Sequence, residues 1–155
     1  MGVEEMVNIT GADETIRMLE KFSNDSRIFK PLVYVGADEI ADEMRRQIQK
    51  LKTDSHPKKG MRYPYESDKK VLLDALGIAP IKEEMTVNTK VGFDGYYTNK
   101  RGEQRPVPLL ANSINHGTSF LIRQNFVGQT ERACKDRVTN RISAKADEII
   151  NKLSK

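Results

Sequence analysis

The sequence has 155 residues, with no tryptophan, one cysteine and two histidines. The scarcity of cysteine and histidine excludes several kinds of bond and site. The single Cys134 excludes an internal disulfide and fits a reducing compartment. His56 and His116 stand in different sequence contexts, so a multi-histidine metal site is not expected. No run of about 18 apolar residues occurs, so we expect no helix that spans a membrane.

Apolar residues are also few, at 37%, whereas charged residues reach 31%. A chain of this length predicts a single domain, residues 1–155, with a thin core, extended loops or stabilisation by partners. Its net charge is uneven, because residues 1–94 sum to −2 and residues 95–155 sum to +6. Such polarity favours head-to-tail docking of copies or proximity to nucleic acid; a merely solvated surface is the plainer interpretation.

Helical periodicity organises the N-terminal half. Residues 10–22 combine a capping-box-like start with apolar residues at helical spacing, which predicts a first helix. A second, longer helix begins near Pro31, and Gly36 within it predicts a local bend. Its apolar stripe is Val33, Ala37, Ile40, Met44, Ile48 and Leu51. Residues 68–76 predict a short third helix, ended by Gly77.

The middle of the chain changes to period-2 alternation. Apolar and polar residues alternate from Met85 to Phe93, which predicts a half-buried antiparallel strand. Asp94 and Gly95 then form a turn signal, followed by a basic loop from Tyr96 to Arg105. Because residues 53–67 and 95–106 are polar and contain glycine and proline, we expect both to be mobile loops.

The segment from Pro106 to Phe120 connects this strand to a long C-terminal helix. It predicts a short helix that stops at His116 and Gly117, with the glycine in a left-handed conformation. Phe120 is expected to anchor the exit in the core, and the last helix runs from about Val127 to Leu153. The fold class is α+β: a small antiparallel sheet packed with two N-terminal helices and a long C-terminal helix.

No arrangement typical of a catalytic site is found. Cys134 lies at core spacing in the last helix and is expected to be buried. His116 is better explained as a histidine at a helix C-terminus than as a general base. The glycines of Val91–Gly95 lack the spacing of a phosphate-binding loop. We therefore expect no catalytic, cofactor-binding or metal-binding residues and no cofactor, and an enzyme is disfavoured.

The succession of strand, basic loop, short helix, turn and long helix resembles the tail-completion proteins of long-tailed bacteriophages and prophages. These are the neck or minor tail proteins of the phage morphogenesis group. The residues that match their pattern form a strand-turn motif, a turn after the short helix and an aromatic before the last helix. They are Gly92, Phe93, Asp94, Gly95, Gly117, Thr118, Ser119, Phe120 and Phe126.

The chain departs from the family pattern at two positions. Asn115 stands where the family usually has an acidic residue, and Asn125 stands where it usually has a proline. The second departure predicts a looser turn before the last helix.

The resemblance implies an α+β subunit that forms a ring, commonly of six copies, at the head-proximal end of the tail. Such a ring connects the tail to the neck and surrounds the path of the DNA without reading its sequence. The implied location is the virion, after assembly in the cytoplasm of a bacterial host. The implied partners are further copies of the chain and the phage neck and tail proteins, with no membrane.

Five basic residues are candidates for contacts between subunits. Lys100, Arg101 and Arg105 lie in the basic loop, and Arg137 and Arg141 follow one border of the last helix. We expect Arg137 and Arg141 to face the acidic half of the next copy rather than the DNA. The alternative is a small basic nucleic-acid-binding protein, against which stand the lack of interleaved aromatics and of a helix-turn-helix.

Overall fold

The computed structural model describes residues 26–56, 59–82 and 87–153. Its elements are α2 (Ser26–Gln49), α3 (Glu66–Ala75), β1 (Leu76–Ile78), β2 (Val91–Phe93), β3 (Tyr96–Thr98), β4 (Gln104–Pro106), α4 (Val107–His116) and α5 (Phe126–Leu153). The α+β class is confirmed, because four helices accompany two antiparallel two-stranded sheets in this described part. The predicted helix at residues 10–22 and Met85 lie outside it.

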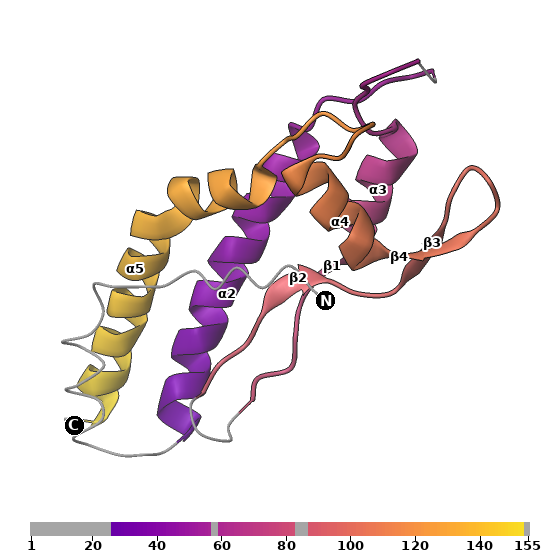
Figure 1. Cartoon of the computed structure of the whole chain (residues 1–155). Coiled ribbons are helices and arrows are strands. Elements are labelled where there is room, and N and C mark those ends of the chain that lie inside the picture. Colours follow the sequence, from indigo (N-terminus) through magenta and orange to yellow (C-terminus); the bar gives the residue numbers. More distant parts are fainter. Residues whose placement is uncertain (1–25, 57–58, 83–86, 154–155) are drawn as a thin grey trace.

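The two long helices, α2 and α5, run antiparallel and lie side by side (Figure 1). We call residues 26–43 of α2 together with residues 131–153 of α5 the arm, and the other described residues the head. In the head, α3 packs on the end of α2, α4 packs on α3, and the β3–β4 hairpin extends away from them (Figure 1). The molecule is therefore elongated, with its small elements gathered at one end.

The arm has its own narrow core between the two helices. Its buried residues are Leu32, Cys134, Val138, Ile142 and Ala146. Gly36 explains how closely the helices approach, since a Cβ atom there would lie 2.9 Å from Ile142 Cδ1. The glycine predicted to bend α2 thus makes room for a side chain of α5.

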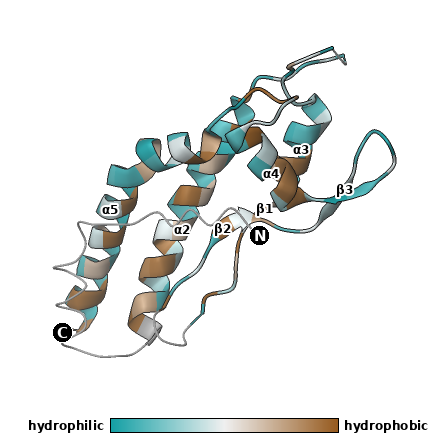
Figure 2. Cartoon of the chain, viewed as in Figure 1, coloured by the Kyte–Doolittle hydropathy of each residue, from teal (hydrophilic) through white to brown (hydrophobic). Residues whose placement is uncertain are grey.

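The head has a larger core, to which every helix contributes. Its buried residues are Met44, Ile48, Leu51, Leu72, Leu76, Val107, Leu110, Ala111, Ile114, Leu121, Phe126 and Val127. Within the head, α4 carries hydrophobic residues and the β3–β4 hairpin is hydrophilic (Figure 2). The predicted short helix, α4, is therefore packed in the head core through four of its residues.

Two expectations about the strands need correction. The predicted strand is shorter than its alternation indicates, because only Val91–Phe93 pairs continuously, with β1. Outside these residues the two segments pair only at isolated positions, such as the antiparallel bridge between Lys82 and Asn88. The partner β1 lies where the sequence predicts the end of a helix and a turn, because three residues are too few to show alternation.

The predicted basic loop also contains structure. Tyr96–Thr98 pairs with Gln104–Pro106, so most of residues 95–106 form a hairpin rather than an open loop. Residues 53–56 and 59–65 lack helix and continuous strand, although Arg62 forms an isolated parallel bridge with Leu121. Mobility of both segments stays a prediction.

Candidate functional site

Two of the residues that carry the family resemblance, Phe93 and Phe126, meet at the start of α5. Phe93 of β2 and Phe126, the first residue of α5, contact each other with ring centroids 6.1 Å apart and planes at 77°. This edge-to-face arrangement is favourable for aromatic rings, and Phe126 is only 1% exposed. Strand-turn motif and last helix are thus joined through a buried aromatic pair.

Gly117 ends α4 in the left-handed region predicted for it, with φ of 78°. A Cβ atom at this position would lie 3.1 Å from the backbone nitrogen of Arg123, so the site is crowded as well as conformationally demanding. The Thr118 hydroxyl then accepts hydrogen bonds from the backbone N–H groups of Phe120 and Leu121, at 3.1 and 3.0 Å. Glycine and threonine together set the direction in which the chain leaves α4.

The side chain that anchors this exit is Leu121 rather than Phe120. Leu121 belongs to the head core, whereas Phe120 is 67% exposed. The expectation that Phe120 enters the core is therefore wrong. In the turn closed by the Thr118 hydroxyl, the Leu121 side chain points into the core and that of Phe120 points outward. Ser119 beside it is also exposed.

Asn115 and Asn125, the two departures from the family pattern, hold the start of α5. The fully buried Asn115 accepts a hydrogen bond from the backbone N–H of Val127 at 3.0 Å. Asn125 accepts one from Gly128 at 3.2 Å, which is the bond of an N-cap residue. A Cβ atom on Gly128 would collide with the Asn125 amide at 2.5 Å. The turn is capped by Asn125, so the loosening predicted for it is not observed.

The β3–β4 hairpin carries three of the basic residues predicted to contact a neighbour. Lys100 lies over the ring of Tyr65, with Nζ 3.6 Å from the ring centroid, and Arg62 contacts the same ring. Arg105 pairs with Glu103 of its own hairpin at 2.7 Å. Arg101 is exposed and makes no ion pair with any residue that the structure describes.

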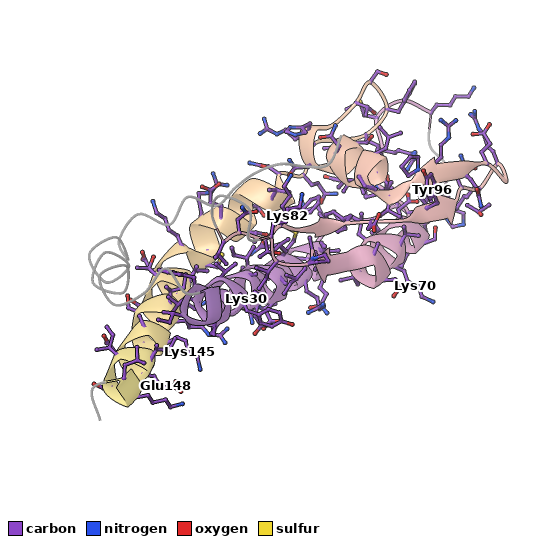
Figure 3. The ribbon with its side chains drawn as sticks, turned by 90° about the horizontal axis from the view of Figure 1, so that it is seen from below. Lys30, Lys70, Lys82, Tyr96, Lys145 and Glu148 are labelled. Atoms are coloured by element: carbon purple, nitrogen blue, oxygen red, sulfur yellow. The ribbon has the colours of Figure 1, made fainter. Side chains whose placement is uncertain are left out.

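The hairpin turn is organised by one side chain. The Asn99 carboxamide oxygen accepts hydrogen bonds from the backbone N–H groups of Arg101 and Glu103, at 2.9 and 3.0 Å. Tyr96, at the base of the hairpin, is 72% exposed and projects outward (Figure 3). The hairpin therefore presents an aromatic side chain and an uncompensated cation on an internally bonded turn.

Arg137 and Arg141 find their acidic partners within the chain. Arg137 bonds to Glu39 at 2.8 Å and to Glu43 at 2.6 Å, and Arg141 bonds to Glu39 at 2.8 Å. These pairs join α5 to α2 along the arm. The acidic groups expected to belong to the next copy are thus in the same subunit, and contact of these arginines with a neighbour stays a prediction.

The carboxylates of this cluster are nearly buried and held in their charged form. Hydrogen bonds from Arg137 and then Arg141 lower the pKa of Glu39. At Glu43 burial acts to raise the pKa, but hydrogen bonds from Gln47 and Arg46 outweigh it, and the pKa is lowered. The same network raises the pKa of both arginines, chiefly through the Glu39 hydrogen bonds. The cluster is therefore a permanent ionic connection between the helices at neutral pH.

Exposed apolar side chains gather on the head. Met61 is 51% exposed, and its neighbour Arg62 pairs with Leu121, which brings Met61 alongside Phe120. The Arg62 N–H donates to the Phe120 carbonyl at 2.8 Å, and the Ile122 N–H donates to the Arg62 carbonyl at 2.9 Å. We call Met61 and Phe120 the apolar tip. Sequence reasoning missed it, because nothing local shows that these two loops pair.

A groove of about 450 Å³ lies on the same side of the head. It is bounded by the end of α2, the irregular residues that follow it, Tyr63 and the start of α5. Its lining residues are Gln47, Lys50, Leu51, Lys52, Tyr63, Ile122, Arg123, Gln124, Asn125, Phe126 and Gln129. Three of these are basic and none is acidic.

Cys134 and His116, the remaining side chains that could take part in catalysis, are both explained by their place in the fold. Cys134 is fully buried as predicted, and burial raises the pKa of its thiol. The His116 ring is exposed at the end of α4 and lies 3.4 Å from the Asn115 amide. Within the described ranges no three metal-ligating side chains come together, and no helix has both the length and the apolarity to cross a bilayer.

Comparison of the chain with known protein families, with curated proteins and with solved structures finds no match.

Proposed function

We propose that the protein is a structural virion subunit that completes the head-proximal end of a long phage tail. In this proposal copies assemble into a ring, commonly of six, that connects the tail to neck proteins and surrounds the exiting DNA. The subunit catalyses no reaction, takes no cofactor, and assembles in the cytoplasm of a bacterial host.

The observation that carries this proposal is the contact between two residues of the motifs, Phe93 and Phe126, at the start of α5. Phe93 packs on Phe126, and the intervening segment turns at Gly117 beside the backbone of Arg123. Residues separated along the sequence but joined in space constrain one another, which a chance succession of short motifs would not require. The resemblance is therefore supported by a contact between the motifs in the folded chain as well as by their order in the sequence.

The surface of the head is suited to assembly. It exposes Met61, Tyr96, Leu109 and Phe120, four of the six large hydrophobic side chains found exposed among the described residues. Exposed apolar groups of this size mark contacts with other proteins when they gather on one region. Tyr34 and Leu153 are exposed on the arm, so a covering neighbour is inferred from Met61 and Phe120, which the pairing of Arg62 with Leu121 places alongside each other.

The arm argues against the nucleic-acid-binding alternative. Arg137 and Arg141, the basic strip on which that alternative depends, are already engaged by Glu39, Glu43 and Asp38. A phosphate group would have to displace these carboxylates. The strip is therefore better explained by the packing of α5 on α2.

Disruption of the gene in its phage tests the proposal. We expect lysates that contain filled heads and separate tails, seen by negative-stain electron microscopy, and restoration of joined particles by the gene in trans. Complete and infectious virions from the disrupted phage would refute the proposal.

A further inference from the structure

The groove on the head is lined by three cations for which the described residues provide no carboxylate partner, although Lys52 lies over the ring of Tyr63. Lys50, Lys52 and Arg123 line it, and none of them forms an ion pair with another described residue. Arg137 and Arg141 of the arm, in contrast, each bind at least one carboxylate at 2.8 Å or less. Uncompensated charge in a concave surface attracts anions more strongly than the same charge on a convex one.

The walls of this groove are held in place before any partner arrives. The Gln124 side chain accepts the Lys52 backbone N–H at 2.8 Å and donates to the Lys52 carbonyl at 3.0 Å. Buried Phe126 forms part of the lining, and the capped start of α5 fixes Asn125. A preformed surface loses less conformational freedom on binding, so a modest electrostatic attraction is enough for a specific contact.

The most acidic stretch of the sequence is its N-terminal segment, residues 1–25, which precedes the described part. It contains six acidic and two basic residues, a net charge of −4, whereas residues 26–155 sum to +8. The segment also contains Ile16, Leu19 and Phe22, so it offers apolar side chains next to its carboxylates. Its chemistry complements that of the groove and of the adjoining apolar tip.

The segment and the groove belong to opposite ends of α2. The segment joins the helix at Ser26, and the groove is formed near Lys50, about 36 Å away for a helix of 24 residues. If the segment of each copy binds the groove of the next copy, every subunit makes one contact through its segment and one through its groove. Such a heterologous contact closes into a ring if the rotation between copies permits.

We propose that the cationic groove of one subunit binds the acidic N-terminal segment of a second copy. This inference rests on the proposed function for its ring, and it identifies the contact that joins the copies.

Zero-length carbodiimide cross-linking of isotope-mixed protein tests the contact. Full-length light and ¹⁵N-labelled chains are unfolded together, refolded, cross-linked and analysed by mass spectrometry. We expect links from Lys50 or Lys52 to carboxylates of residues 1–25, including links between light and heavy chains. Links confined to chains of one label, or none to that segment, would overturn the inference.

Charge reversal at Arg123 sharpens the test, because this residue lines the groove but does not react with the reagent. We expect Arg123→Glu to lower the yield of mixed links about fivefold, and Glu20→Arg in the same chain to restore part of it. Lys70→Glu, on exposed α3 (Figure 3), is the matched control and should leave the yield unchanged. An equal loss with Lys70→Glu would mean that net charge, and not the groove, governs association.

Two further outcomes separate this inference from neighbouring ones. If a DNA oligonucleotide abolishes the mixed links in wild-type protein and is bound with an affinity that Arg123→Glu removes, the groove is a nucleic-acid site and the inference fails. If mixed links form as expected while the disrupted phage still joins heads to tails, the contact stands and the proposed function fails.

Discussion

The arm and the head of this protein solve the problem of a small core in different ways. The arm is two helices with a narrow apolar seam, reinforced by arginines of α5 that reach carboxylates of α2. The head buries more side chains but leaves Met61, Tyr96, Leu109 and Phe120 exposed. Glu39 and Glu43 of the arm are paired with arginines of the same chain, whereas Lys50, Lys52 and Arg123 of the head form no ion pair with a described residue. Both regions contribute to stability, and the proposed function assigns the contacts with neighbours to the exposed groups of the head.

The largest effect is expected from a change inside the head core. Phe126→Ala should lower the free energy of unfolding by about 3–5 kcal/mol, since it removes a fully buried ring and its contact with Phe93. Chemical denaturation measures the loss. Phe120→Ala is the matched control and should change stability by no more than about 0.5 kcal/mol. Similar losses for the two variants would show that Phe120 is not on the surface.

A smaller effect is expected where the chain turns out of α4. Gly117→Val should cost about 2 kcal/mol, because valine disfavours positive φ and its Cβ would press on the Arg123 backbone. Gly102→Val has the same φ of 78° with nothing within 4 Å, so thermal unfolding should show a lesser loss. A stable Gly117→Val protein would contradict the helix stop.

The ionic cluster of the arm should contribute less again. Glu39→Gln should reduce stability at pH 7 by about 1–2 kcal/mol, whereas Asp42→Asn, at an exposed pair, should have almost no effect. Because the folded-state pKa of Glu39 is lowered, its contribution is present above the pKa of the unfolded state and is lost as the pH falls through the folded one. The difference between wild type and Glu39→Gln should therefore shrink below about pH 4 in urea titrations. A constant difference would contradict the pairing.

The elements that sequence predicted best are those that depend on neighbouring residues. The buried residues of α5 from Cys134 to Ala146 and the left-handed Gly117 follow from spacing and from backbone preference, and they are confirmed, whereas Leu153 at the end of the same apolar spacing is exposed. The short β1 lacked a pattern long enough to recognise. A sequence met alone thus gives the helices and their stops more readily than the pairing of short strands.

The candidate surfaces were harder to predict, because they depend on contacts between distant residues. Nothing near Arg137 shows that its partners are Glu39 and Glu43, about a hundred positions away. The groove joins residues that follow α2 to residues that precede α5 and is visible only after folding. Asn125 could have been recognised as a cap, since asparagine before a helix is favoured there, but its comparison with a family proline obscured this role.

The most direct test of the division between arm and head is a phage that carries a surface change without a loss of stability. Met61→Ser with Phe120→Ser alters only the apolar tip, so the purified variant should unfold at the wild-type denaturant concentration. We predict that the same phage yields filled heads and unjoined tails in negative-stain images. Fully joined, infectious particles from a variant of unchanged stability would contradict the account.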